Sequence, residues 1–165
     1  MILEGKVIKL GDNINTDFII AGRYKFSITD IKELAKHIME DIDPNFVNKI
    51  EYGKTILVAG KNFGLGSSRE QAPLVIKEAG ILAVVAESFA RIFYRNAINL
   101  GLPLIETTTI DIKENELLRI DLDKGMLYNL TQKQTIKVNP LPSFMQNFIK
   151  EGGVINYIKK YGLKL

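Results

Sequence analysis

The residues of this sequence best suited to chemistry lie together at 64–72, which read Gly-Leu-Gly-Ser-Ser-Arg-Glu-Gln-Ala. An apolar run at 55–60 precedes them and an amphipathic segment follows, an order that predicts strand, glycine turn and helix. The start of a helix carries free backbone N–H groups and a partial positive charge, so it attracts anions. With Ser67, Ser68 and Arg69 at such a start, the segment could hold a carboxylate or phosphate beside a hydroxyl oxygen.

The same segment also fits a purely structural turn, in which a serine caps the helix and Arg69 and Glu70 form a surface pair. Glu70 follows Ser67 by three residues, which predicts a capping box that leaves Ser68 and Arg69 free to face a ligand. The two glycines of the segment allow close approach of the backbone to a bound group. The residue types alone leave both interpretations open.

Three better-known chemistries fit the sequence less well. The Gly-Lys-Ser/Thr ending of a phosphate-binding P-loop is absent, and residues 60–64 lack the spacing of a dinucleotide fingerprint. A Ser–His–Asp triad needs a histidine, and His37, the single histidine, falls off the apolar face of a predicted helix. Chemistry at Ser67 would therefore require either an environment that lowers its pKa or a group from another chain.

A second polar segment, Asn-Ile-Asn-Thr-Asp at 13–17, precedes an apolar run at 18–21 and the residues Gly-Arg-Tyr-Lys-Phe-Ser at 22–27. Taken alone, this pattern predicts an Asx turn before a buried strand, with a mobile loop after it.

A third segment, at 87–97, predicts an amphipathic helix with Ser88 as its cap. Arg91 and Arg95 are four residues apart and share one face of that helix. Two like charges without an intervening acid indicate an anion or a partner surface, although a solvated face is the alternative. Helical spacing directs three apolar side chains toward the core, namely Phe89, Ile92 and Phe93.

The remaining pattern alternates between strands and helices, which predicts one α/β domain over residues 1–165 with a mixed sheet. Strands are expected at 6–10, 55–59, 81–86 and 104–105, and in a hairpin at 118–122 and 135–138 with a turn at 123–125. Helices are expected at 31–39, capped by Thr29 or Asp30, and at 73–79, 89–99, 143–150 and 154–161.

Composition limits the class of protein. A hydrophobic content of 46% with 25% charged residues is ordinary for a soluble globular chain, and no apolar run approaches the ~20 residues that span a bilayer. The chain has no cysteine, which excludes disulfides and thiolate metal sites on it, and no signal peptide is visible, so we expect a cytoplasmic protein. The net charge of +3 is modest, and lysines 159, 160 and 164 indicate a solvated helix end rather than a nucleic-acid surface.

Taken together, residues 15–24, 62–72 and 87–97, with Glu-Gly-Gly at 151–153, resemble the family of 3-isopropylmalate dehydratase small subunits. The likeness runs in order along nearly the whole chain, and its serine segment and Ser-Phe-Ala-Arg-Ile segment outweigh the structural alternatives. The family corresponds to the mobile swivel domain of aconitases. The resemblance therefore implies a three-layer β/β/α swivel domain with a mixed sheet, as in the aconitase C-terminal domain.

The resemblance also implies half of a hydro-lyase, active only with a large subunit in a heterodimer or heterotetramer. The family's [4Fe–4S] cluster is held by three cysteines of that large subunit, so no cofactor or metal is expected on this chain. The implied reaction interconverts 2-isopropylmalate and 3-isopropylmalate by dehydration and rehydration, a step of leucine biosynthesis. The isolated chain could self-associate through the apolar face meant for its partner. No nucleic-acid or membrane partner is implied.

By position, Ser67 matches the family's catalytic serine, whose alkoxide removes the C–H proton of the substrate. Arg69 matches the residue that grips a substrate carboxylate, and Ser68 is its hydrogen-bonding neighbour. Asp17 matches a carboxylate that works beside acid–base groups of the partner.

The loop that contains Tyr24, Lys25 and Phe26 matches the specificity region of the family. Homoaconitase-type chains carry an arginine where Phe26 stands, so Phe26 favours the apolar substituent of isopropylmalate. Lys25 is adjacent and could still reach a carboxylate as a point charge, which leaves the small subunits of homoaconitase and 2,3-dimethylmalate dehydratase as alternatives. A stand-alone anion-binding module is the alternative that involves no catalysis.

Overall fold

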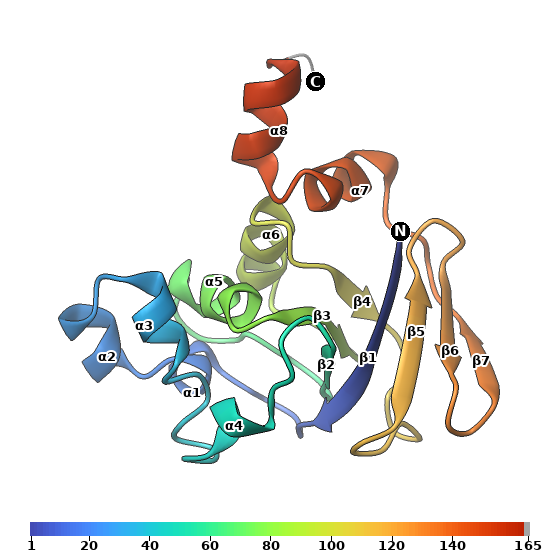
Figure 1. Ribbon diagram of the computed structural model, residues 1–165, viewed down its shortest axis with the longest axis horizontal. Coiled ribbons are helices and arrows are strands. Elements are labelled where there is room, and N and C mark those ends of the chain that lie inside the picture. Colours follow the sequence, from blue (N-terminus) through green and yellow to red (C-terminus); the bar gives the residue numbers. More distant parts are fainter. Residues whose placement is uncertain (164–165) are drawn as a thin grey trace.

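The chain is built on one seven-stranded sheet with the strand order β4-β3-β2-β1-β5-β6-β7 (Figure 1). The computed structural model describes residues 1–163, so the predicted role of Lys164 lies outside the described residues. The strands are β1 (Ile2–Lys9), β2 (Thr55–Val58), β3 (Ile81–Ala86), β4 (Leu104–Glu106), β5 (Leu117–Asp121), β6 (Met126–Asn129) and β7 (Gln134–Lys137).

Strand β1 joins the parallel and antiparallel halves of the sheet, because it pairs parallel with β2 and antiparallel with β5. The parallel half continues through β3 and β4, and the antiparallel half is a meander of β5, β6 and β7. All four residues of β2 are buried, as expected for a parallel strand that is covered on both faces. Strand β5 instead alternates, with Leu118 and Ile120 buried and Leu117 and Arg119 exposed. The mixed sheet predicted from the sequence is confirmed.

Helices fill the connections of the parallel half and follow the antiparallel half at the C-terminal end (Figure 1). In the part of the chain that the structure describes, no helix is both long and apolar enough to cross a membrane. The helices are α1 (Thr16–Ile19), α2 (Gly22–Ser27), α3 (Ile31–Ala35), α4 (Phe46–Lys49), α5 (Gln71–Glu78), α6 (Arg91–Asn99), α7 (Ser143–Lys150) and α8 (Val154–Tyr161).

The segment after β1 differs most from its sequence prediction. The apolar run at 18–21 was expected as a buried strand, but residues Thr16–Ile19 form helix α1. The side chain of Asn15 accepts a hydrogen bond of 2.9 Å from the N–H of Phe18, which is a helix cap rather than the entry to a strand. The expected mobile loop is likewise helical, as α2.

The helix expected at 31–39 is also shorter than its apolar spacing indicated. Asp30 caps it by accepting from the N–H of Lys32, but the regular helix ends at Ala35. The following residues form turns, and Met39 has a φ of 50°, which is incompatible with a continuous helix. Buried Ile38 and Met39 still reach the core, so the spacing identified the buried face correctly.

Candidate functional site

Three loops meet at the carboxyl ends of the parallel strands β1, β2 and β3, and these loops carry the three segments singled out in the sequence. Backbone hydrogen bonds join them: the N–H of Gly64 donates to Ile14 at 2.7 Å, and the N–H of Thr16 donates to Leu65 at 2.9 Å. The N–H of Ala90 donates to Phe63 at 2.9 Å. The carboxyl edge of parallel strands is where α/β sheets bind ligands, so the topology itself assembles the candidate site.

Ser67 and Ser68 are both exposed, and they line a pocket of about 220 Å³, hereafter the serine pocket. Buried Thr16 holds Ser67 in place, because its hydroxyl donates to the backbone carbonyl of Ser67 at 3.0 Å. The two hydroxyl oxygens of Thr16 and Ser67 are 3.4 Å apart. The serine pocket is lined by Thr16, Gly64, Gly66, Ser67, Ser68, Arg69, Ala90, Arg91, Ile92, Phe93 and Asn96.

The predicted capping box at Ser67 and Glu70 is wrong. Helix α5 begins at Gln71, with Glu70 as N-cap and no side-chain cap bond. The N–H of Arg69 donates to the carbonyl of Ser67 at 2.8 Å, so the serines belong to a turn that precedes the helix. The contacts of this turn with Thr16 override the local capping preference.

The helix start that faces the serine pocket is that of α6, not that of α5. The first three residues of α6, namely Arg91, Ile92 and Phe93, line the pocket beside Ser67. Within residues 1–163, no group accepts a hydrogen bond from the backbone N–H groups of these three residues. Free amide hydrogens and the positive end of a nine-residue helix are therefore available at the pocket.

Gly64 is needed for contact with α6 rather than for the approach of a ligand. A Cβ at this position would lie 2.2 Å from Cγ of Phe93, and the φ of Gly64 is 84°. Only glycine adopts this backbone conformation freely and allows the loop to lie directly on the helix. Gly66, by comparison, would place a Cβ 3.3 Å from the hydroxyl of Thr16.

Arg69 connects the serine turn to α1 and α2. Its guanidinium forms an ion pair with the carboxylate of Asp17, whose side chain is 62% exposed against 19% for Arg69. The contact lacks hydrogen-bond geometry, since the buried Nη1 of Arg69 has no hydrogen-bond partner among the described residues. A Cβ at Gly22 would lie 3.7 Å from both terminal nitrogens of Arg69, so the guanidinium also contacts the start of α2.

The three predicted specificity residues lie on α2 and do not line the serine pocket. The hydroxyl of Tyr24 donates to Glu40 at 3.0 Å, and its ring stacks on His37 with 3.9 Å between centroids. The ammonium of Lys25 lies 5.6 Å from the ring centroid of Phe26, and Phe26 is 83% exposed. The structure thus brings Ser67, Ser68, Arg69 and Asp17 together but leaves these three residues outside the pocket.

Other predictions for the α6 segment are only partly correct. Ile92 was expected in the core, but it is 55% exposed and lines the serine pocket, whereas Phe93 is buried as expected. Ser88 does not cap α6, because its hydroxyl accepts from the N–H of Asn62 at 2.8 Å. Sequence reasoning missed Asn96, which lies one turn beyond Ile92 on the same face and could have been found from that spacing.

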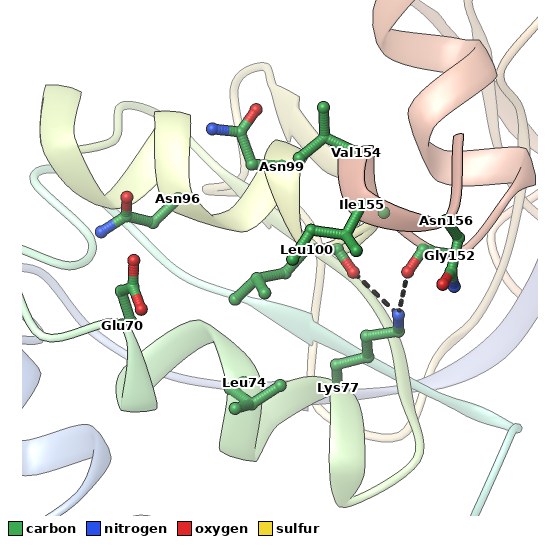
Figure 2. Close-up of a pocket in the computed structure, with 11 residues that line it drawn as sticks. Glu70, Leu74, Lys77, Asn96, Asn99, Leu100, Gly152, Val154, Ile155 and Asn156 are labelled. Atoms are coloured by element: carbon green, nitrogen blue, oxygen red, sulfur yellow. Dashed lines mark hydrogen bonds between the residues drawn. The ribbon is translucent and has the colours of Figure 1, made fainter. Parts of the chain in front are cut away.

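A larger cavity of about 430 Å³ lies between α5, α6 and the start of α8 (Figure 2). The ammonium of Lys77 donates there to the carbonyls of Leu100 at 2.7 Å and Gly152 at 2.9 Å. Burial lowers the pKa of Lys77 from its ordinary value of 10.5, and the charge of Glu78 opposes this only in part. Lys77 therefore joins three helices at this cavity, which shares Asn96 with the serine pocket.

Within the described part of the chain, no three side chains of His, Cys, Asp or Glu lie close enough to hold a metal ion. The donor groups of the site are instead hydroxyls, a guanidinium and backbone amides, which suit an anionic ligand.

Comparisons with known proteins agree with this geometry. The family model described as the aconitase C-terminal domain matches residues 15–109, which include Thr16, the serine turn and the start of α6. The chain is 51% identical over 162 residues to 3-isopropylmalate dehydratase small subunit 1 of Thermotoga maritima, covering 98% of this chain and 97% of that protein. It is 56% identical over 158 residues to the 3-isopropylmalate dehydratase small subunit of Aliarcobacter butzleri, covering 95% and 94%.

A crystal structure of 3-isopropylmalate dehydratase from Methanocaldococcus jannaschii superimposes with a TM-score of 0.92. The two chains are 48% identical, and the match covers 99% of this chain and 96% of the other. The expected swivel fold of the aconitase C-terminal domain is thereby confirmed. The chain belongs to the family of 3-isopropylmalate dehydratase small subunits.

Proposed function

We propose that this chain is the small subunit of a hydro-lyase that interconverts 2-isopropylmalate and 3-isopropylmalate in leucine biosynthesis. Two exposed serines beside the guanidinium of Arg69, whose counter-ion Asp17 is largely exposed, are the observation that carries the proposal. A hydroxyl oxygen for proton transfer and a cation for a carboxylate are the two groups that dehydration of a hydroxy diacid requires.

Ser67 is the proposed base. Its alkoxide takes the proton from the carbon next to the one that carries the hydroxyl, and the electron pair of that C–H bond forms the double bond as hydroxide departs. A serine alkoxide needs a pKa far below the ordinary value of a hydroxyl, so it needs donors and positive charge nearby. The free amides at the start of α6 and the guanidinium of Arg69 both border the serine pocket and supply them.

Arg69 is the proposed anchor for a substrate carboxylate. Nη1 of Arg69 forms an ion pair with Asp17 but no hydrogen bond, so a bound carboxylate would add the charge-assisted hydrogen bond that this ion pair lacks. Asp17 neutralises the guanidinium before substrate binds, and its exposed side chain is free to turn away toward groups of the partner. Ser68, exposed at the same pocket, is placed to donate a further hydrogen bond.

The large subunit is proposed to hold the [4Fe–4S] cluster, since this chain has no cysteine to ligate one. When bound there, the cluster supplies a Lewis acid that polarises the departing hydroxyl. The exposed serine pocket of this chain covers the substrate from the opposite side in a heterodimer or heterotetramer. We propose the cytoplasm as its location.

Reconstitution with a cluster-bearing large subunit tests the proposal. The isolated chain should be inactive, and the pair should isomerise 2-isopropylmalate. Ser67→Ala should lower kcat by about 10²–10⁴-fold, the contribution typical of a general base, without changing assembly measured by size-exclusion chromatography. Thr135→Ala, which removes an exposed hydroxyl on β7, is the control and should retain the wild-type rate.

A Ser67→Ala pair with full activity would remove Ser67 from the mechanism. Tight binding of a hydroxy diacid to the isolated chain, measured by titration calorimetry, together with no activity in the pair would favour a stand-alone anion-binding module instead.

A further inference from the structure

We infer that the face formed by α6 and the start of α7 is a docking surface for the large subunit, and that it takes an acidic segment with apolar side chains. The inference rests on the proposed function, because it assumes that a large subunit covers the serine pocket.

The surface is a groove of about 370 Å³ between α6 and α7, hereafter the arginine groove. Arg91 lines both this groove and the serine pocket, so the two hollows are adjacent. A body that covers the serine pocket also covers Arg91, which brings it to the edge of the groove. The arginine groove is lined by Arg91, Tyr94, Arg95, Ile98, Asn99, Phe144, Met145 and Phe148.

The charge of the arginine groove has no counterpart on this chain. Arg91 and Arg95 are exposed, and neither forms an ion pair with any residue in the range 1–163. No acidic side chain lines the groove. Guanidinium groups on an otherwise apolar surface favour carboxylates of a partner, which they bind in a bidentate manner. The complementary segment is therefore acidic.

Apolar side chains border the same groove. Phe144 is 53% exposed and lies edge-on to buried Phe148, with 5.9 Å between ring centroids. Ile92, which is 55% exposed, continues the apolar surface toward the serine pocket. Exposed aromatic and arginine side chains around a hollow are the composition typical of interface anchors. The partner segment should therefore also present apolar side chains.

A second copy of this chain fits the arginine groove poorly. A two-fold contact centred on the groove would gather the arginines of both copies in one interface to which the groove contributes no acidic side chain, and like charges in an interface are repulsive. The chain as a whole also carries a net charge of +3. Charge complementarity thus favours the large subunit over the self-association that the sequence suggested for the isolated chain.

The test measures the affinity of this chain for its cluster-bearing large subunit by titration calorimetry. Arg95→Glu should raise Kd at least about tenfold, because it places a like charge against the acidic segment. Phe144→Ser should also raise Kd, by loss of apolar contact. At saturating small subunit, both variants should reach the wild-type rate, since neither residue lines the serine pocket. Lys133→Glu, an exposed charge reversal between β6 and β7 (Figure 1), should leave Kd unchanged.

Higher ionic strength should weaken binding of the wild type more than binding of Arg95→Glu, because it screens exposed charges. If both variants bind like the wild type while the wild type restores activity, the docking surface is wrong and the proposed function stands. If the wild type neither binds nor activates the large subunit, the proposed function itself fails. A wild-type dimer in sedimentation that Arg95→Glu converts to monomers would assign the groove to a second copy instead.

Discussion

Thr16 is the residue on which the position of Ser67 most directly depends. Thr16 as a whole is only 2% exposed. Its hydroxyl donates to the carbonyl of Ser67, and its backbone N–H donates to the carbonyl of Leu65. Since that hydroxyl proton is used on the carbonyl, the Oγ1 oxygen can only accept from the hydroxyl of Ser67 at 3.4 Å. Thr16 is therefore proposed as a positioning residue, which orients Ser67 through these hydrogen bonds.

We predict that Thr16→Val lowers kcat of the reconstituted pair about tenfold, because a misplaced reacting group loses part of the advantage of orientation. The carbonyl of Ser67 loses one of its two donors and keeps the N–H of Arg69, so the free energy of unfolding should fall by about 0.5–1.5 kcal/mol, the net value of one hydrogen bond. Thr16→Ser keeps the hydroxyl and should restore the rate. The measurement is kcat for both variants together with urea unfolding.

A purely structural role for Thr16 gives a different result. Both variants would then share the wild-type kcat at a temperature where each is folded, and only the unfolding midpoint of Thr16→Val would fall. Equal rate losses in Thr16→Val and Thr16→Ser would also contradict the prediction, because the hydroxyl would then be irrelevant.

The sequence grouped the central candidate residues because they are consecutive in the chain. Ser67, Ser68 and Arg69 form one motif, and no knowledge of long-range contacts was needed to group them. Thr16 on α1 and Asn96 on α6 are 51 and 29 positions away from Ser67 in the sequence, and only the folded sheet brings them to the same pocket. A local sequence pattern therefore could not identify the roles of Thr16 and Asn96, because these roles depend on tertiary contacts.

At the level of elements, the helix start at the site was correctly expected but assigned to the wrong helix. The capping-box pattern of Ser67 and Glu70 is a local preference worth about 1 kcal/mol. The turn around Ser67 is held instead by Thr16 and by the contact of Gly64 with Phe93, which together outweigh that preference. The start of α6 faces the pocket only because β2 and β3 are neighbours in the sheet.

Helices α5, α6 and α7 are joined through one lysine, whose ammonium donates to the carbonyls of Leu100 and Gly152 (Figure 2). We predict that Lys77→Met lowers the free energy of unfolding by about 1–3 kcal/mol at pH 7, since both carbonyls lose a charged donor. The control is Lys32→Met, at an exposed lysine on α3, which should change the free energy of unfolding little. Urea unfolding at constant temperature measures both.

The pH dependence of this difference has a definite sign. Burial lowers the pKa of Lys77 in the folded chain below its ordinary value of 10.5, so the folded state binds fewer protons than the unfolded state between the two pKa values. The free energy of unfolding of the wild type therefore rises as pH increases through that window. Methionine does not titrate, so Lys77→Met lacks this rise. The advantage of the wild type over Lys77→Met should therefore be greater at pH 10 than at pH 7, and an equal or smaller advantage would contradict the assigned burial.

At the level of the whole molecule, the strand order explains why one site forms from three distant segments. The alternation of strands and helices was visible in the sequence, and the C-terminal helices were predicted with their correct bounds. The sequence did not show that β1 lies beside β2 and β2 beside β3, because strand neighbours are set by the packing of whole units rather than by local residue types. That residues 1–165 form one domain stays a prediction, which the single continuous sheet supports.

Substrate choice is the property that most depends on the assembled enzyme. Phe26 is 83% exposed on α2 and lies outside the serine pocket, although the start of α2 contacts Arg69 through Gly22. Docking of the large subunit would therefore have to enclose Phe26 before it could contact a substrate side chain. An exposed phenylalanine contributes little to folding, so Phe26→Arg should leave the free energy of unfolding within about 0.5 kcal/mol of the wild type.

In the reconstituted pair, we predict that Phe26→Arg lowers kcat/KM for 2-isopropylmalate and raises it for hydroxy acids with an additional carboxylate. A guanidinium at this position would bind that carboxylate and would face the apolar isopropyl group unfavourably. The ratio of the kcat/KM values for the two substrate classes should therefore change by at least about tenfold. Lys32→Ala, on neighbouring α3, is the control and should change neither value. Unchanged ratios in Phe26→Arg would show that α2 stays outside the site even in the assembled enzyme, and substrate choice would then have to come from the large subunit.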